Sequence, residues 1–236
     1  MEKKPDFSNS AYIFPPINRE GVKFGLIGLV IYLILASLIE NFLPQVREIV
    51  GILFFVMWGV FLFFRDPERY PPNDERAILS PADGRICLIQ ECEFPDELGE
   101  IEEYKGKKFW RVSVFMSVFN VHVNRMPTAG TILKKQYVAA GKFFNASLDK
   151  ASKENERCNY LVKADSGEVY AVTQIAGLVA RRIVPQVNEG EHKANAEHFG
   201  LIRFGSRLDV YIPEGVKPVV RVGQIMVAGE TILARR

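Results

Sequence analysis

Residues 121–124 read Val-His-Val-Asn, in which apolar and polar side chains alternate with a period of two. This is the period of a β-strand, so His122 and Asn124 are predicted to share one face. Similar runs rich in Val, Ile and Phe, separated by Gly, Pro and Asp, lie to either side at 85–90, 109–119, 130–138, 161–164 and 169–175. Asp165-Ser166-Gly167 predicts a hairpin turn between the last two runs. The pattern therefore predicts one mainly β domain over residues 65–236, in a chain of the α+β class.

Four other segments of this domain have patterns that indicate their secondary structure less directly. Residues 146–157 are mostly polar with alternating charges, which favours a surface helix or a loop, and residues 175–184 fit either a helix or a strand. Residues 187–198 are predicted to form a loop, because their histidines lack the spacing of helical metal ligands. Residues 219–233 resemble the compact β architecture of biotinyl- and lipoyl-type domains, which favours a compact sandwich-like or barrel-like form.

Composition excludes several classes of protein. A formal net charge of +2 on 236 residues, without a dense Lys/Arg stripe, argues against nucleic acid as a partner. The three cysteines, Cys87, Cys92 and Cys158, are odd in number and lie in a chain too long to need a disulfide framework. They are also too isolated to supply the four ligands of a zinc site, so we expect reduced thiols and no metal.

The N-terminal quarter contains two uncharged apolar runs, FGLIGLVIYLILASLI at 24–39 and IVGILFFVMWGVFLFF at 49–64. Each is slightly shorter than the ~20 residues that span a bilayer core, so flanking residues must lengthen it. We predict a polar tail at 1–21 and a membrane helical hairpin at 22–64, with Pro44 in its turn. Two buried core helices, or a shallow re-entrant hairpin, are the alternatives.

Basic residues indicate how such a hairpin is oriented. Positive charges flank the hairpin on both sides and are sparse in its connecting loop: Lys3, Lys4, Arg19 and Lys23 precede it, Arg65 and Arg69 follow it, and Arg47 lies in the loop. The positive-inside rule then puts both ends in the cytoplasm. The β domain is expected on the cytoplasmic face of the cell membrane.

Three segments carry a family resemblance. They are SPADGRI at 80–86, FMSVFNVHVNRMP at 115–127 and FGLIRFGS at 199–206, in that order along the chain. A Gly-Ser pair alone is common in turns. Together, the three segments resemble the phosphatidylserine decarboxylase family in its short prokaryotic branch, from about Phe64 to the C-terminus.

The resemblance implies a proenzyme that cuts its own backbone. Ser206 Oγ would attack the carbonyl of Gly205 to form an ester, and elimination of that ester would give a β chain of residues 1–205 and an α chain of residues 206–236 that starts with a pyruvoyl group. The two chains would stay together as a heterodimer, and higher oligomers are possible in this family. The pyruvoyl group made from Ser206, with no metal, would form a Schiff base with phosphatidylserine in the membrane. Release of carbon dioxide then gives phosphatidylethanolamine, a step of phospholipid biosynthesis.

The same resemblance assigns His122 as proton acceptor and donor and Asp83 as the carboxylate that orients it. Without the resemblance, Asp83 could be a turn residue and His122 an ordinary strand histidine. The longer bacterial and mitochondrial branch has a second histidine where this chain has Arg125. Either His122 serves both cleavage and decarboxylation, or another group such as His198 contributes.

Three other functions are compatible with parts of the sequence. An archaetidylserine decarboxylase would use the same headgroup chemistry on an ether lipid. A membrane-anchored serine hydrolase could use Ser206, His122 and Asp83, although no Gly-x-Ser-x-Gly elbow surrounds Ser206. A membrane-tethered β module without enzymatic activity would keep an intact chain.

Overall fold

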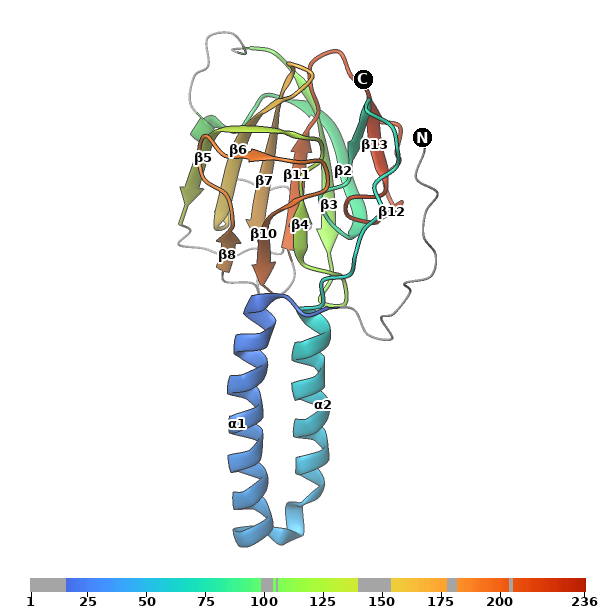
Figure 1. Cartoon of the computed structure of the whole chain (residues 1–236). Coiled ribbons are helices and arrows are strands. Elements are labelled where there is room, and N and C mark those ends of the chain that lie inside the picture. Colours follow the sequence, from blue (N-terminus) through green and yellow to red (C-terminus); the bar gives the residue numbers. More distant parts are fainter. Residues whose placement is uncertain (1–15, 99–103, 105, 140–153, 178–181, 204–205) are drawn as a thin grey trace, which may run out of the picture. The chain divides into compact units, whose positions relative to one another are not determined.

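The computed structural model describes residues 16–98, 104, 106–139, 154–177, 182–203 and 206–236 (Figure 1). The chain divides into two compact units, residues 1–68 and residues 69–236. The first is helical and the second is built from strands.

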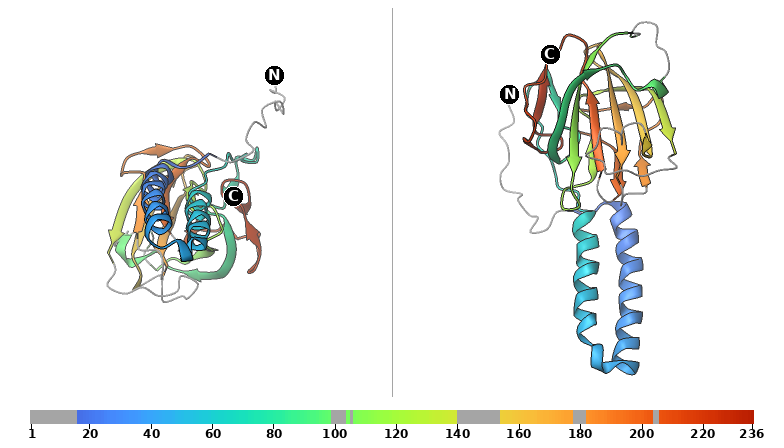
Figure 2. Two further views of the ribbon diagram at one scale, coloured as in Figure 1. Left: turned by 90° about the horizontal axis from the view of Figure 1, so that it is seen from below. Right: turned by 180° about the vertical axis from the view of Figure 1, so that it is seen from behind.

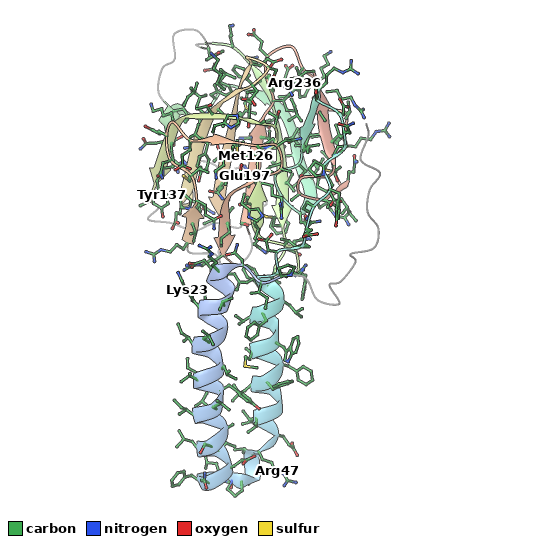
Figure 3. All side chains as sticks on the ribbon, in the orientation of Figure 1. Lys23, Arg47, Met126, Tyr137, Glu197 and Arg236 are labelled. Atoms are coloured by element: carbon green, nitrogen blue, oxygen red, sulfur yellow. The ribbon has the colours of Figure 1, made fainter. Side chains whose placement is uncertain are left out.

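The N-terminal unit is a helical hairpin. Helix α1 covers Arg19–Phe42 and helix α2 covers Glu48–Phe63, and the 3-10 turn η2, Pro44–Val46, joins them. Asn18 caps α1 by accepting a hydrogen bond from the backbone N–H of Glu20 at 3.1 Å. The turn at Pro44 follows the sequence prediction, whereas α1 begins at Arg19 and not at residue 22. Lys23 and Arg47 mark the two ends of the hairpin (Figure 3).

The two helices approach closely where α1 has glycine. A Cβ atom on Gly25 would lie 2.3 Å from the ring of Phe61, whereas a Cβ on Gly28 would meet nothing within 4 Å. Most other apolar side chains of α1 are exposed, and only 6% of its most apolar 18-residue window is buried. Its mean hydropathy of 2.4 over that window makes α1 long and apolar enough to cross a membrane. The exposure does not fit a buried core helix.

The C-terminal unit is mainly β, as predicted, and strands make up 39% of the residues that the structure describes. Its eight-stranded sheet has the order β12-β2-β3-β11-β7-β6-β5-β9, and smaller sheets have the orders β4-β10-β8 and β1-β13. Within the described residues the large sheet does not close into a barrel, and Figure 2 shows its curvature. The strands are β1 Ala77–Leu79, β2 Gly84–Cys92, β3 Phe109–Met116, β4 Val123–Arg125, β5 Gly130–Val138, β6 Arg157–Ala164, β7 Val169–Ala176, β8 Arg182–Pro185, β9 His192–Lys193, β10 His198–Arg203, β11 Ser206–Tyr211, β12 Ile225–Met226 and β13 Ile232–Arg235, with a 3-10 turn η3 at Asp96–Leu98.

Local predictions had mixed outcomes. The hairpin at 165–167 is confirmed: β6 and β7 pair in antiparallel register, and Gly167 has a φ of 102°. The loop predicted at 187–198 is wrong in part, because β9 lies within it and β10 begins at its end. Most of the predicted helix at 146–157 lies outside the described residues, as do residues 178–181 of the ambiguous segment at 175–184.

One core joins the large sheet to the three-stranded sheet. Ile183 of β8 and Ile202 of β10 belong to the same buried cluster as Leu208 of β11. All three cysteines are free thiols, and Cys158 is buried in this core. Burial raises the pKa of Cys158 to about 11, so it stays protonated at neutral pH.

Candidate active site

Ser206 is the first residue of β11, in the middle of the large sheet. Its backbone is paired with Met116 of β3 on one side and with Ala176 of β7 on the other. Its side chain has no exposed surface. Gly205 lies outside the described residues, so the structure places the serine of the Gly-Ser pair but not the bond between them.

Two polar side chains meet the sulfur of Met116. The Ser206 hydroxyl lies 3.9 Å from Met116 Sδ, and Asn124 Nδ2 lies 3.7 Å from the same atom. Asn124 belongs to β4 in the smaller sheet, so this contact links the two sheets at the end where β11 begins. The sequence placed Asn124 on the same face as His122 but gave it no role.

A buried chain of amides fixes the orientation of Asn124. Gln174 Nε2 donates to Asn124 Oδ1 at 2.8 Å, and Tyr160 Oη donates to Gln174 Oε1 at 2.7 Å. Because Asn124 Oδ1 accepts from Gln174, its amide nitrogen is left facing Met116. A Cβ at Gly200 would lie 2.8 Å from Gln174 Nε2, which explains the glycine in FGLIR. Sequence analysis missed Gln174 and Tyr160, which carry no motif and meet Asn124 only in the fold.

His122 lies just before β4 and is 2% exposed. Its Nδ1 lies 2.8 Å from the carbonyl oxygen of Asn120. A carbonyl can only accept, so this contact assigns the proton to Nδ1 and leaves the lone pair on Nε2. The backbone oxygen of His122 accepts a hydrogen bond from the N–H of Ile202 in β10 at 3.3 Å.

Asp83 is held by two donors. Arg69 Nη2 donates to its Oδ2 at 2.7 Å, and the backbone N–H of Ala228 donates to its Oδ1 at 2.8 Å. Arg69 was counted from the sequence as a membrane-topology charge, but its side chain is only 10% exposed and is paired with this carboxylate. The next residue, Gly84, is required by close packing, since a Cβ there would lie 2.1 Å from the oxygen of Phe115.

The three sequence motifs are neighbours in space. Strand β4, from the second motif, pairs with β10 of the third motif. The N–H of Arg125 in β4 donates to the oxygen of Pro81 in the first motif at 2.9 Å. Met126 N–H likewise donates to the oxygen of Glu197 at 2.8 Å, and Figure 3 shows these two residues side by side. The side chains of His122 and Asp83, by contrast, bind the different groups described above.

Arg125 and His198 face each other across the β4–β10 ladder as Cα partners. His198 begins β10, and Arg203 ends it, five residues away. At about 3.3 Å per residue this separates them by roughly 16 Å. The backbone oxygen of His122 is bonded to the N–H of Ile202, near the end of β10 that leads to Ser206, whereas His198 lies at the other end of the strand.

The opposite face of β11 buries charge. Arg207 donates to Asp209 through Nε at 2.8 Å and through Nη2 at 2.9 Å, and neither side chain is exposed. Arg111 of β3, 6% exposed, lies 4.0 Å from the same carboxylate. A bidentate pair of this kind fixes the position of both groups. The sequence shows only alternation at these positions and gave no sign of the pairing.

Acidic, histidine and cysteine side chains do not gather in groups of three or more suited to a metal ion, as far as the described residues reach.

Comparison with known proteins gives a consistent result. The family model for phosphatidylserine decarboxylase matches residues 57–234. A phosphatidylserine decarboxylase proenzyme from Erythrobacter litoralis is 50% identical, over 96% of this chain and 90% of its own length. A protein of the same name from Novosphingobium aromaticivorans is 49% identical over 95% of this chain and 88% of its own length. One from Ruegeria pomeroyi is 50% identical over 81% of this chain and 93% of its own length.

Proposed function

The chain belongs to the phosphatidylserine decarboxylase family of carboxy-lyases, and we propose that it cuts itself before Ser206 and then converts phosphatidylserine to phosphatidylethanolamine. One observation carries the self-processing part. The serine of the Gly-Ser pair is the buried first residue of a strand held on both sides, beside a thioether and an amide. Burial limits the access of water to the site where the bond would break.

The residues around Ser206 fit a pyruvoyl group formed from it. Such a group is no larger than the serine that it replaces, and the rest of β11 stays in the ladder with β3 and β7. Met116 and Ala176, the register partners of Ser206, would hold it from either side. The group supplies a ketone that takes up the headgroup amine and withdraws the electron pair left by carbon dioxide.

His122 is the proposed acceptor of the Ser206 proton in self-cleavage. A serine hydroxyl is a weak nucleophile until a base removes its proton. With Nδ1 bound to Asn120, Nε2 is the nitrogen able to take that proton and to return one later. The position of His122 at the Ser206 end of β10 supports its use in both stages, whereas His198 lies at the far end.

Asp83 is proposed to act as the anionic member of the site. Its hydrogen bonds to Arg69 and to the N–H of Ala228 hold the carboxylate in place and tie the SPADG loop to the C-terminal segment. In this structure the carboxylate orients Arg69. The contact between Asp83 and His122 remains a prediction.

The two chains would remain one molecule after cleavage. Strands β11, β12 and β13 all follow residue 205, and they pair with β3 and β7, with β2 and with β1, which all precede it. The α chain is thus bound through three strands to the β chain, which supports a lasting heterodimer.

The apolar hairpin supports a membrane location. We propose that it anchors the catalytic unit to a membrane that contains phosphatidylserine, on the cytoplasmic side, as the basic residues at both ends of the hairpin favour. The linker from Phe64, at the end of the apolar run, to Arg69 is five residues long and spans at most about 17 Å. Whatever its orientation, the catalytic unit stays close to the bilayer in which its substrate lies.

Intact-mass measurement of the purified chain tests the proposal. We expect two fragments, residues 1–205 and 206–236, the smaller with a terminal carbonyl that hydroxylamine or borohydride modifies. Ser206→Ala should leave one chain and no decarboxylation. Ser113→Ala is the matched control, since Ser113 is also buried, lies on the neighbouring strand and has a hydroxyl without a hydrogen-bond partner in the described structure. An intact chain that decarboxylates phosphatidylserine would refute the mechanism, and an intact inactive chain would favour a hydrolase or a binding module.

A further inference from the structure

A short turn separates the two strands that lead to the candidate site. It covers residues 117–120, between Met116, which touches Ser206, and His122. Val118 in this turn is 46% exposed and Phe119 is 83% exposed. Phe119 is the most exposed large apolar side chain among the described residues. Scattered apolar side chains are normal on protein surfaces, but here two adjacent ones project from one turn beside a candidate active site.

Hydrogen bonds hold this turn in shape. Asn120 Oδ1 accepts from the backbone N–H of Ser117 at 2.9 Å and from its hydroxyl at 2.8 Å. The N–H of Asn120 donates to the oxygen of Ser117 at 3.0 Å. Residues 117–120 thus form a β-turn that is closed by a backbone hydrogen bond and by the Asn120 side chain, and Phe119 points outward from it.

The turn is also coupled to the proposed base. The carbonyl of Asn120 is the group that binds His122 Nδ1 at 2.8 Å. Asn120 therefore connects the exposed tip at Phe119 to the buried imidazole. The contact to His122 comes from the backbone of Asn120 and not from the Phe119 side chain, so a substitution of Phe119 leaves it in place.

The bilayer is the occupant that best suits this tip. The turn leads into β4, whose Arg125 binds the SPADG loop, and that loop holds Arg69, the first residue of the unit. The apolar hairpin ends five residues before Arg69. The connection to the membrane and the Val118–Phe119 tip thus belong to the same part of the catalytic unit. Apolar side chains such as Phe insert at the boundary between lipid headgroups and acyl chains, next to the level at which the reacting amine of the substrate lies.

We propose that Val118 and Phe119 insert into the membrane surface and dock the active site on its lipid substrate, as a contact separate from the helical hairpin. This inference rests on the proposed function, because it takes a bilayer lipid as the substrate. It assigns residues 117–120 a role in delivering lipid to the site and none in the chemistry. Phe119 is therefore a positioning residue.

Proteoliposomes can distinguish a role of the turn in membrane docking from a role in the chemistry. The full-length chain is reconstituted in phosphatidylcholine vesicles, and decarboxylation is measured on long-chain phosphatidylserine in the bilayer and on dihexanoyl-phosphatidylserine in solution. Phe119→Ser should raise the KM for the bilayer substrate about fivefold, the size expected for partial loss of the transfer of one aromatic side chain from water. Its kcat, its self-cleavage and its KM for the soluble substrate should not change. Phe119→Trp should restore the KM.

Val222→Ser is the matched control. Val222 is 61% exposed and also lies in a turn of this unit, beside β12, which strands β2 and β3 separate from β11. It should leave both substrates unaffected. Equal losses on both substrates with Phe119→Ser, or no loss on either, would overturn the docking role.

A second readout does not depend on activity. A polarity-sensitive fluorophore on Phe119→Cys should shift to the blue on reconstitution and be quenched by brominated lipids, whereas the same label on Val222→Cys should not. The unsubstituted chain gives the background from Cys87 and Cys92. An unquenched label at position 119 would refute insertion. A wild-type chain inactive on both substrates would refute the proposed function, and the label would still decide whether the turn enters the bilayer.

Discussion

The two units of this chain place their side chains in opposite ways. The helical unit exposes apolar groups, with Leu26 60% exposed and Ile27 56% exposed. The β unit buries charged and amide groups, with Arg207, Asp209 and Asn124 all at 0%. Helices satisfy their backbone groups internally and can enter lipid, whereas a polar group buried in a β core must find a partner.

The difference shows which residues specify the structure of each unit. Each apolar helix is specified by consecutive residues of the chain. Each buried polar group of the β unit depends on a partner from another strand or position, such as Gln174 for Asn124, fifty residues away. Substitutions that remove one partner should therefore be far more damaging in the β unit than substitutions on the helix surfaces.

The largest expected effect is at the buried ion pair. Asp209→Leu would leave Arg207 and Arg111 without their shared carboxylate in the sheet. Removing one partner of a buried pair costs about 3–5 kcal/mol, so the variant should lose most of its stability. Chemical unfolding in detergent, followed by circular dichroism, measures the loss.

The double variant Arg207→Leu with Asp209→Leu is the control for this comparison. Because it removes the Arg207 charge as well, and leaves only the more distant Arg111 without this carboxylate, it should recover part of the lost stability. A double variant as unstable as Asp209→Leu would show that the strand needs the pair itself, and that the cost does not come from the unpaired arginine.

The amide chain should give the next effect. Asn124→Leu removes the acceptor of Gln174 and the amide that faces Met116, and leaving a buried donor unsatisfied costs about 2–3 kcal/mol. Self-cleavage should slow as well, as gel analysis of the two fragments over time would show. Tyr160→Phe, which removes only the outer hydroxyl of the chain, should cleave at nearly the normal rate. Equal slowing in both variants would argue against a local role for Asn124.

A third effect is expected only at high pH. Burial raises the pKa of Cys158 from 9.0 to about 11, and its neutral form is the protonated one. The folded chain therefore keeps a proton that the unfolded chain loses, so this stabilisation is complete below pH 9 and is lost as the pH rises to about 11. The free energy of unfolding should fall by about 2 kcal/mol or less across this window. Cys158→Ala should flatten that slope and Cys92→Ala should not.

The smallest effect should be in the hairpin. Gly25→Ala forces the ring of Phe61 to move, which we expect to cost about 1 kcal/mol. Gly28→Ala meets nothing within 4 Å and should be neutral or slightly stabilising, since alanine favours helices. Thermal unfolding of the two variants in detergent measures the difference. Equal midpoints would show that the helices do not need the close approach at Gly25.

Sequence reasoning succeeded where the signal is local. The helices, the turn at Pro44 and the hairpin at Gly167 each follow from adjacent residues and were confirmed. The three motifs were recognised from the chain, and they meet in the fold: β4 pairs with β10, and the N–H of Arg125 donates to the oxygen of Pro81. The mainly β class was likewise predicted from period-two runs.

Sequence reasoning fell short where an interaction joins distant strands. Nothing near Gln174 or Tyr160 shows that they orient Asn124, because their hydrogen bonds form only when two sheets pack together. Arg69 resembled a topology charge because its partner, Asp83, lies fourteen residues further along a loop. The sequence left His198 as an alternative to the second histidine of the longer branch. In the structure, His198 lies at the end of β10 that is far from Ser206.

The position of Ser206 at the start of a central strand has a consequence for the supply of enzyme. A diffusible cofactor can leave and be replaced, but a group formed from this residue is part of the backbone between β3 and β7. Under the proposed self-cleavage, each polypeptide would be activated once and could not be recharged if that carbonyl were spent. The cell would then renew activity only by translating new chains, so protein synthesis and turnover would set its capacity to make the lipid product.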